Sequence, residues 1–223
     1  MGDVVATPCG RRAIKHLLII NPNSSRPVTD AIRTSAASLN REGWLYTVEQ
    51  IDQGPAVIEG LKDEVVAAPL VLRRIMDLQD QYDAFLVACH GDPGVLAIRE
   101  VVAKPVVGIG ETSLLVACAL GRGFGLITLG SALVAKKWRQ IREYGLEQRC
   151  VCVEPTEAGV LHGVAEGAHF DVYVDAARRA VARGADVLVL GCASMAPAAR
   201  AVEEQVGVTV VEPVAAAISI ICR

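Results

Sequence analysis

Two short stretches of this chain share one pattern, and that pattern constrains the fold more than any other feature. Each stretch begins with an aspartate, continues as an apolar run and ends at a cysteine followed by small residues: Asp83 to Cys89 and Asp186 to Cys192. A short apolar run bounded by turn residues is typical of a buried strand. Each cysteine is therefore predicted at the carboxyl end of a strand, at the edge of an open α/β sheet where ligands bind.

The spacing after the two cysteines also matches. Val107 lies 18 residues after Cys89, Val210 lies 18 residues after Cys192, and each valine falls in a predicted strand. Each of these strands then meets a glutamate and an alanine-rich helix. The sequence therefore predicts two related α/β halves with a pocket between them. The alternative is a chance similarity between two ordinary strand–helix units.

Strands and helices are predicted to alternate along the rest of the chain. Hydrophobic residues make up 52% of the sequence and aromatic residues only 4%, as buried parallel strands and their covering helices require. Two expectations concern helix ends. Thr29 is expected to cap a helix that ends near Arg41, and Pro69 is expected to separate a helix at 59–68 from another at 69–81. A longer helix is expected over 168–183.

Composition excludes several classes of protein. The net charge of -3 argues against a nucleic-acid-binding surface. No apolar run approaches the roughly 20 residues of a membrane span. No signal-peptide pattern is seen at the N-terminus, so we expect a cytoplasmic protein whose seven cysteines are reduced thiols.

Cys89 and Cys192 differ from the other cysteines because both precede predicted helices. A helix N-terminus carries partial positive charge and free N–H groups, which stabilise a thiolate. Inverting a carbon centre through a carbanion needs a base on one face and an acid on the other, and two opposed cysteines supply both. This chemistry needs neither a metal nor an organic cofactor, and we expect none. The other interpretation is a small-molecule binding module in which both thiols are merely buried.

Further groups at the same sheet edges are candidates for contact with a substrate. Some offer amide or hydroxyl groups, and the loop after the first cysteine offers backbone N–H groups to an oxyanion. Ordinary turns and helix caps are the alternative for all of them, and Asp92 is expected to cap the helix that follows it. The candidates are Asn23, Ser24, His90, Gly91, Thr112 and Pro213.

Four segments resemble the aspartate/glutamate/hydantoin racemase superfamily, and within it the hydantoin and allantoin racemases. They are Ile20-Asn-Pro-Asn-Ser24, Ala88-Cys-His-Gly-Asp-Pro-Gly94, residues 184–195 and the run Val-Val-Glu-Pro-Val-Ala-Ala-Ala at 210–217. The resemblance implies two pseudo-symmetric Rossmann-like lobes, each a mostly parallel sheet flanked by helices, with the active site in the cleft between them. We assign residues 1–112 and 213–223 to the first lobe, with 1–13 as a tail, and residues 113–212 to the second.

The resemblance also implies a cofactor-independent racemase in which Cys89 and Cys192 form the acid/base pair. Substrate contact is implied for Asn23 and for the residues after each cysteine, which include Ala193 and Ser194. His-Gly-Asp follows the first cysteine and Ala-Ser the second, where amino-acid racemases of the superfamily carry Asn and a hydroxyl residue. The resemblance therefore favours a cyclic ureide, with inversion at C5 of a 5-substituted hydantoin or of allantoin.

The resemblance leaves other enzymes of the superfamily open: an amino-acid racemase, a maleate-isomerase-like enzyme or a decarboxylase-like enzyme. His90 stands where relatives often carry a different side chain, so it is expected to tune the preference for the C5 substituent. The expected partners are a small cyclic ureide and further copies of the chain, with no nucleic acid and no membrane.

Overall fold

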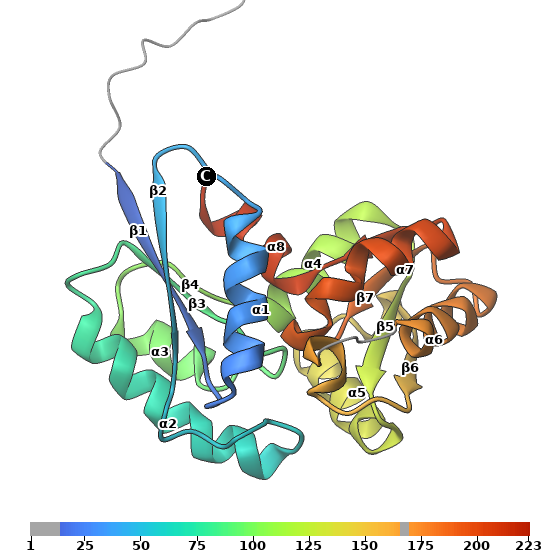
Figure 1. Cartoon of the computed structure of the whole chain (residues 1–223), viewed down its shortest axis with the longest axis horizontal. Coiled ribbons are helices and arrows are strands. Elements are labelled where there is room, and N and C mark those ends of the chain that lie inside the picture. The colour runs from blue at the N-terminus through green and yellow to red at the C-terminus, as the bar shows by residue number, and fades with distance from the viewer. Residues whose placement is uncertain (1–13, 166–169) are drawn as a thin grey trace, which may run out of the picture.

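Two parallel sheets of four strands each organise the molecule (Figure 1). The computed structural model describes residues 14–165 and 170–223. The strand orders are β2-β1-β3-β4 and β6-β5-β7-β8, so the second sheet repeats the first. The predicted α/β fold with two related halves is confirmed. The strands are β1 (Lys15–Asn21), β2 (Trp44–Gln50), β3 (Ala84–Val87), β4 (Val106–Gly108), β5 (Phe124–Leu129), β6 (Cys150–Thr156), β7 (Val187–Leu190) and β8 (Thr209–Val211).

Helices alternate with these strands, as parallel connections require. They are α1 (Arg26–Ala37), α2 (Leu61–Leu78), α3 (Val95–Val101), α4 (Ile109–Leu120), α5 (Val134–Glu143), α6 (Asp171–Ala182), α7 (Ala199–Val206) and α8 (Pro213–Ile221), with short 3-10 helices η1 (Ser131–Leu133), η2 (Glu147–Arg149), η3 (His162–Val164) and η4 (Ala193–Ala198). Across the described ranges, no helix combines the length and the apolar character needed to span a bilayer.

We call the first sheet with α1, α2, α3 and α8 the first lobe, and the second sheet with α4 to α7 the second lobe. The chain crosses between them through α4 and returns through α8, and these two helices pack against each other. In Figure 1, α1, α4 and α8 lie between the two sheets. The predicted boundary after residue 112 falls inside α4, and the predicted return at residue 213 is the first residue of α8. The division of the chain at these residues stays a prediction.

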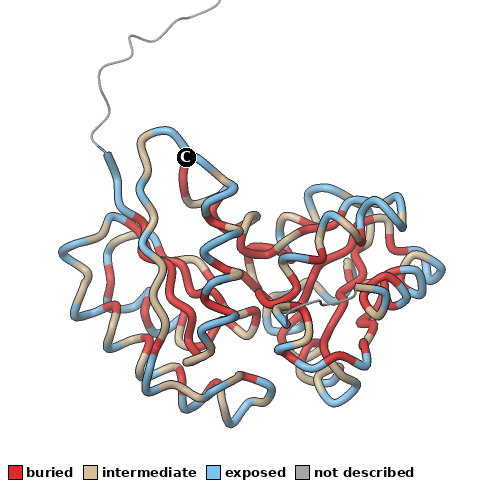
Figure 2. The backbone as a smooth tube through the Cα atoms, viewed as in Figure 1, coloured by how far each residue is buried: buried red, intermediate tan, exposed pale blue. Residues whose placement is uncertain are grey.

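The largest hydrophobic core runs between the lobes. It joins Leu17 and Ile19 of β1 and Ile32 of α1 to Leu190 of β7 and Ile218 of α8. Buried backbone accordingly continues from one sheet to the other in Figure 2. Two smaller cores lie on the opposite face of each sheet, one beneath α2 and α3 and one beneath α4 and α5. The lobes are therefore held together on the side of α1 and α8 by packing that both share.

Two predicted helix ends are wrong. Ser25, not Thr29, caps α1, and Thr29 lies buried inside the helix, which ends at Ala37. Pro69 does not separate two helices, because α2 continues through it. The buried residues of α2 keep helical spacing on both sides of Pro69, whose side chain faces solvent, so burial outweighs the roughly 3 kcal/mol that an interior proline costs. The predicted start of a helix at residue 168 lies outside the described residues.

Candidate active site

The two cysteines occupy equivalent places in the two lobes. The residue before each one donates its backbone N–H to the central strand of its sheet, Ala88 to Ile20 O and Gly191 to Ile127 O, both at 2.8 Å. This repeated hydrogen bond ends β3 and β7 in the same way. Cys89 and Cys192 therefore leave the two sheets in matching positions, and both line one cavity between the lobes.

This cavity is small, with a volume of about 30 Å³. That is room for about two water molecules, far below the roughly 300 Å³ at which small-molecule pockets begin. Besides the cysteines, the cavity is lined by Ile58, His90, Gly91, Leu129, Leu133, Lys136, Lys137, Val160 and Gly191. The structure therefore shows the site closed, with its thiols between apolar walls and two lysines.

Burial raises the pKa of the Cys89 thiol to about 12. The backbone N–H of Gly91 and the ammonium of Lys136 act against this shift, and the carboxylate of Glu64 adds to it. In the closed state the sulfur of Cys89 is therefore a thiol, which suits the role of proton donor.

Cys192 immediately precedes η4 and has a polar partner. Its Sγ lies 3.1 Å from Oγ of Ser194, and either atom can be the donor. Ser194 is fully buried, and Ala193 beside it is nearly so. The two predicted contacts that follow Cys192 are thus close to its sulfur in sequence and, for Ser194, in space.

His90 links the first cysteine loop to the second lobe. Its Nδ1 lies 3.0 Å from Nζ of Lys137, and its Nε2 lies 3.4 Å from Oγ of Ser113. Gln140 Nε2 donates to the His90 carbonyl oxygen. Burial holds the pKa of the His90 imidazole well below its ordinary value, and the charge of Lys137 adds to this shift. The ring is therefore neutral, with Nδ1 as the acceptor for the ammonium.

Asp92 holds the other end of the same loop. It has φ of 49°, a left-handed conformation that aspartate tolerates. Its carboxylate accepts from Gly110 N at 2.9 Å, from Glu111 N at 2.7 Å and from the Tyr144 hydroxyl at 2.7 Å. Asp92 therefore caps α4. The prediction that it caps the helix that directly follows it, α3, is wrong.

Six of the predicted substrate contacts do not line the cavity, namely Ala193 and Ser194 beside Cys192 and four residues on other elements. The side-chain oxygen of Asn23 accepts from Asn21 Nδ2 and Ser25 N, both at 2.9 Å, so it braces the loop after β1. Ser24 donates its backbone N–H to Pro55 O at 3.0 Å. Thr112 lies buried in the first turn of α4, and Pro213 begins α8. Contact between these residues and a substrate stays a prediction.

Sequence reasoning missed two lysines that line the cavity and the carboxylate that pairs with one of them. Lys136 and Lys137 come from α5, and Glu64 comes from α2 and pairs with Lys136 at 2.6 Å. A signal was present, because Lys137, Gln140 and Ile141 fall on one face of α5 and all three are buried. A lysine on the apolar face of a helix points to a buried ammonium with a specific partner.

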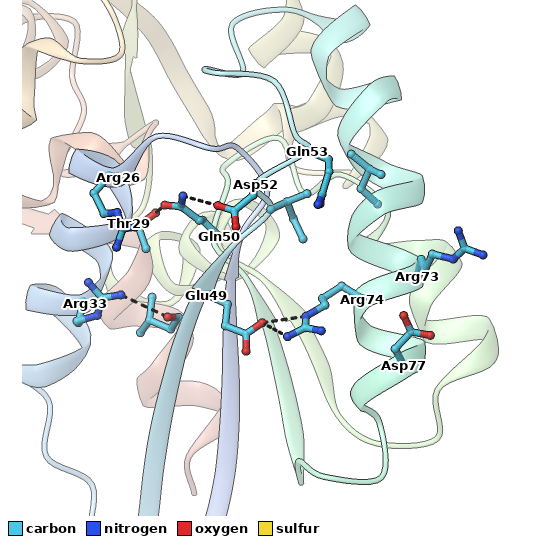
Figure 3. Close-up of a pocket in the computed structure, with 13 residues that line it drawn as sticks. Arg26, Thr29, Arg33, Glu49, Gln50, Asp52, Gln53, Arg73, Arg74 and Asp77 are labelled. Atoms are coloured by element: carbon cyan, nitrogen blue, oxygen red, sulfur yellow. Dashed lines mark hydrogen bonds and ion pairs between the residues drawn. The ribbon is translucent and has the colours of Figure 1, made fainter.

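A larger cavity, of about 540 Å³, lies apart from the cysteines between α1, the end of β2 and α2 (Figure 3). Its polar groups largely satisfy one another. Arg74 donates twice to Glu49 Oε2, at 2.9 and 2.8 Å, and Gln50 Nε2 donates to Asp52 Oδ1 at 2.7 Å. None of the predicted site residues lines it. Within residues 14–165 and 170–223, no three His, Cys, Asp or Glu side chains are grouped to hold a metal ion.

Comparison with known proteins identifies the family of the chain. Residues 17–221 match the sequence model of the family described as Asp/Glu/Hydantoin racemase. The chain is 34% identical over 203 residues to a hydantoin racemase of Pseudomonas sp. (strain NS671), covering 90% of this chain and 82% of that protein. It is 31% identical over 205 residues to the hydantoin racemase of Paenarthrobacter aurescens, covering 90% of this chain and 87% of that protein.

The fold also matches that of a solved racemase structure. The structure of an allantoin racemase from Klebsiella pneumoniae superimposes with a TM-score of 0.85 at 29% identity, covering 93% of this chain and 86% of that one. The chain therefore belongs to the Asp/Glu/Hydantoin racemase family and is an enzyme of the racemase class.

Proposed function

We propose that this enzyme inverts C5 of a cyclic ureide, a 5-substituted hydantoin or allantoin, using Cys89 and Cys192 as a two-base pair. The observation that carries the proposal is that the two thiols, from equivalent positions in two repeated lobes, line one cavity. The named relatives, which act on hydantoins or allantoin, support the substrate class.

The reaction needs one thiolate and one thiol. The thiolate removes the C5 proton and becomes a thiol, while the C5–H electron pair delocalises into the adjacent carbonyl as an enolate. The opposite thiol then gives its proton to the other face of C5 and becomes the thiolate. Protons and charge balance over the cycle, and the enzyme is left with the thiolate on the other cysteine. We assign the binding of the enolate oxygen to backbone N–H groups in the loop of Gly91.

Replacement of each cysteine by serine tests the pair. A serine hydroxyl is too weak an acid to replace either the thiol or the thiolate, so C89S and C192S should each lower racemisation by about 10²–10⁴-fold. Optical rotation measures the racemisation, and deuterium uptake at C5 measures proton removal. Each single variant should retain exchange from at most one enantiomer.

Cys118→Ser is the matched control, since Cys118 is half-buried in α4 and does not line the cavity. It should racemise as the wild type does. Full racemisation by either C89S or C192S would reject the two-thiol mechanism. A panel that also contains free amino acids and an arylmalonate separates the cyclic ureide from the other substrates open to the superfamily.

A further inference from the structure

The ammonium of Lys137 is buried beside both cysteines without an anionic partner. The residue is 3% exposed, and its one hydrogen-bond partner in the described part of the chain is the neutral ring of His90, 3.0 Å away. No carboxylate oxygen of that part lies within ion-pairing distance of its Nζ. A buried ammonium is costly to the fold unless a negative charge compensates it.

Only a few groups near Lys137 could carry the compensating negative charge. Its titratable neighbours are Lys136 on the same helix, Glu64 on α2, Cys89, His90 and Asp92 in the loop after β3, and Cys192 after β7.

Two of these neighbours are carboxylates, and both already have partners of their own. The carboxylate of Glu64 lies 2.6 Å from Lys136. The carboxylate of Asp92 accepts three hydrogen bonds, two from the N-terminus of α4 and one from Tyr144. The remaining groups that can carry negative charge near Lys137 are the two thiols. Charge on either sulfur stabilises the ammonium, whereas burial lowers the pKa of Lys137 to about 8.

We infer that Lys137 is a positioning residue whose fixed positive charge, held by His90, keeps one of the two cysteines ionised. Its role in turnover rests on the proposed function, whereas its effect on thiol ionisation does not. Because Lys137 lines the cavity with both sulfurs, one cation serves whichever cysteine is the thiolate. The negative charge passes from one sulfur to the substrate and on to the other sulfur while the cation stays in place, as preorganised catalysis requires.

His90 fits this role through its hydrogen bonds. Its Nδ1 accepts from Lys137, so the ring proton is on Nε2 and faces Oγ of Ser113. The Ser113 hydroxyl donates in turn to Gly110 O at 3.0 Å. The chain of contacts fixes the ring, and the ring fixes the ammonium at the cavity wall.

The test is the pH dependence of alkylation of Cys89 and Cys192 by iodoacetamide, followed by peptide mass spectrometry. The inflection of the rate reports the thiol pKa, whatever the rate of access to the cavity. Lys137→Met removes the charge and keeps an apolar stem. This substitution should raise the pKa of the more acidic of the two thiols by about one unit. The alkylation rate of that thiol at pH 7 should then fall about tenfold. Lys137→Arg, which keeps the charge, should stay closer to the wild type than K137M.

Lys62→Met is the control, since Lys62 is exposed on α2 and its loss should leave the inflection unchanged. If K137M does not fold, Lys137→Gln keeps an N–H donor for His90 and removes the charge. A folded K137M or K137Q with the wild-type inflection would overturn the inference. This outcome is independent of the proposed function, which fails when the wild type racemises no member of the substrate panel.

Discussion

A single buried carboxylate, that of Asp92, positions the loop of the first cysteine. It accepts three hydrogen bonds from two other elements of the fold, and the amide of an asparagine has only one oxygen to replace them. Asp92→Asn should therefore lower the free energy of unfolding at pH 7 by about 1–3 kcal/mol, as urea unfolding would measure. A loss below about 0.5 kcal/mol would show that the cap matters little.

The burial of Asp92 also predicts how the stability of the fold depends on pH. Burial raises the pKa of Asp92 from 3.8 to about 6. Between these values the folded chain binds a proton that the unfolded chain has released, so this group adds stability as the pH falls from about 6 to about 4. Relative to D92N, the wild type should gain up to about 3 kcal/mol in unfolding free energy between pH 7 and pH 4.

The control for this pH prediction is Asp77→Asn, which changes an exposed aspartate on α2. Its unfolding free energy should follow that of the wild type at every pH. The prediction is contradicted if the curves for the wild type and D92N run parallel from pH 7 to pH 4.

At the scale of elements, Glu212 joins α8 to α1, the two helices on the side where the lobes share their core. Its carboxylate caps α8 by accepting from Val214 N and Ala215 N, both at 2.8 Å, and it also accepts from the hydroxyl of Ser35 in α1. Glu212→Ala should lower the unfolding free energy by about 2 kcal/mol, through the lost cap and the unpaired serine. Glu212→Asp keeps the charge and a capping oxygen, so its loss should be below about 1 kcal/mol. Equal losses for both variants would argue against the cap.

Much of this architecture could be predicted from local sequence. The alanine-rich helix predicted after the second glutamate is found as α8, because a proline opens the helix and an apolar run fills it. The strands that lead to Cys89 and Cys192 were predictable for the same reason, since each apolar run ends at a clear change of composition.

The contacts that build the wall of the site were not predictable in this way. His90 and Lys137 are 47 residues apart and meet only because α5 of one lobe packs over a loop of the other. The continuation of α2 through Pro69 likewise depends on what its buried face contacts. Local patterns identify elements and the residues at their ends, whereas contacts between lobes need the assembled fold.

At the scale of the whole molecule, the closed cavity implies motion. A space for about two water molecules does not admit a substituted ring, so we expect the lobes to separate at the site when a substrate binds. They share a continuous apolar core on the side of α1 and α8, which favours a hinge there. On the side of α2 and α5, the ion pair between Glu64 and Lys136 spans the lobes, with side chains only 10% and 14% exposed. We expect this pair to favour the closed state.

Replacing both partners, as Glu64→Gln with Lys136→Gln, removes the pair without leaving an uncompensated charge. The open state should become more populated, so Cys89 should react several-fold faster with a bulky maleimide relative to its rate with iodoacetamide at the same pH, a ratio from which the ionised fraction of the thiol cancels. The matched control neutralises the exposed pair of Asp30 and Arg33 within α1, which does not span the lobes and should leave this ratio unchanged. A ratio in E64Q/K136Q equal to that of the wild type would mean that the apolar walls alone hold the site closed.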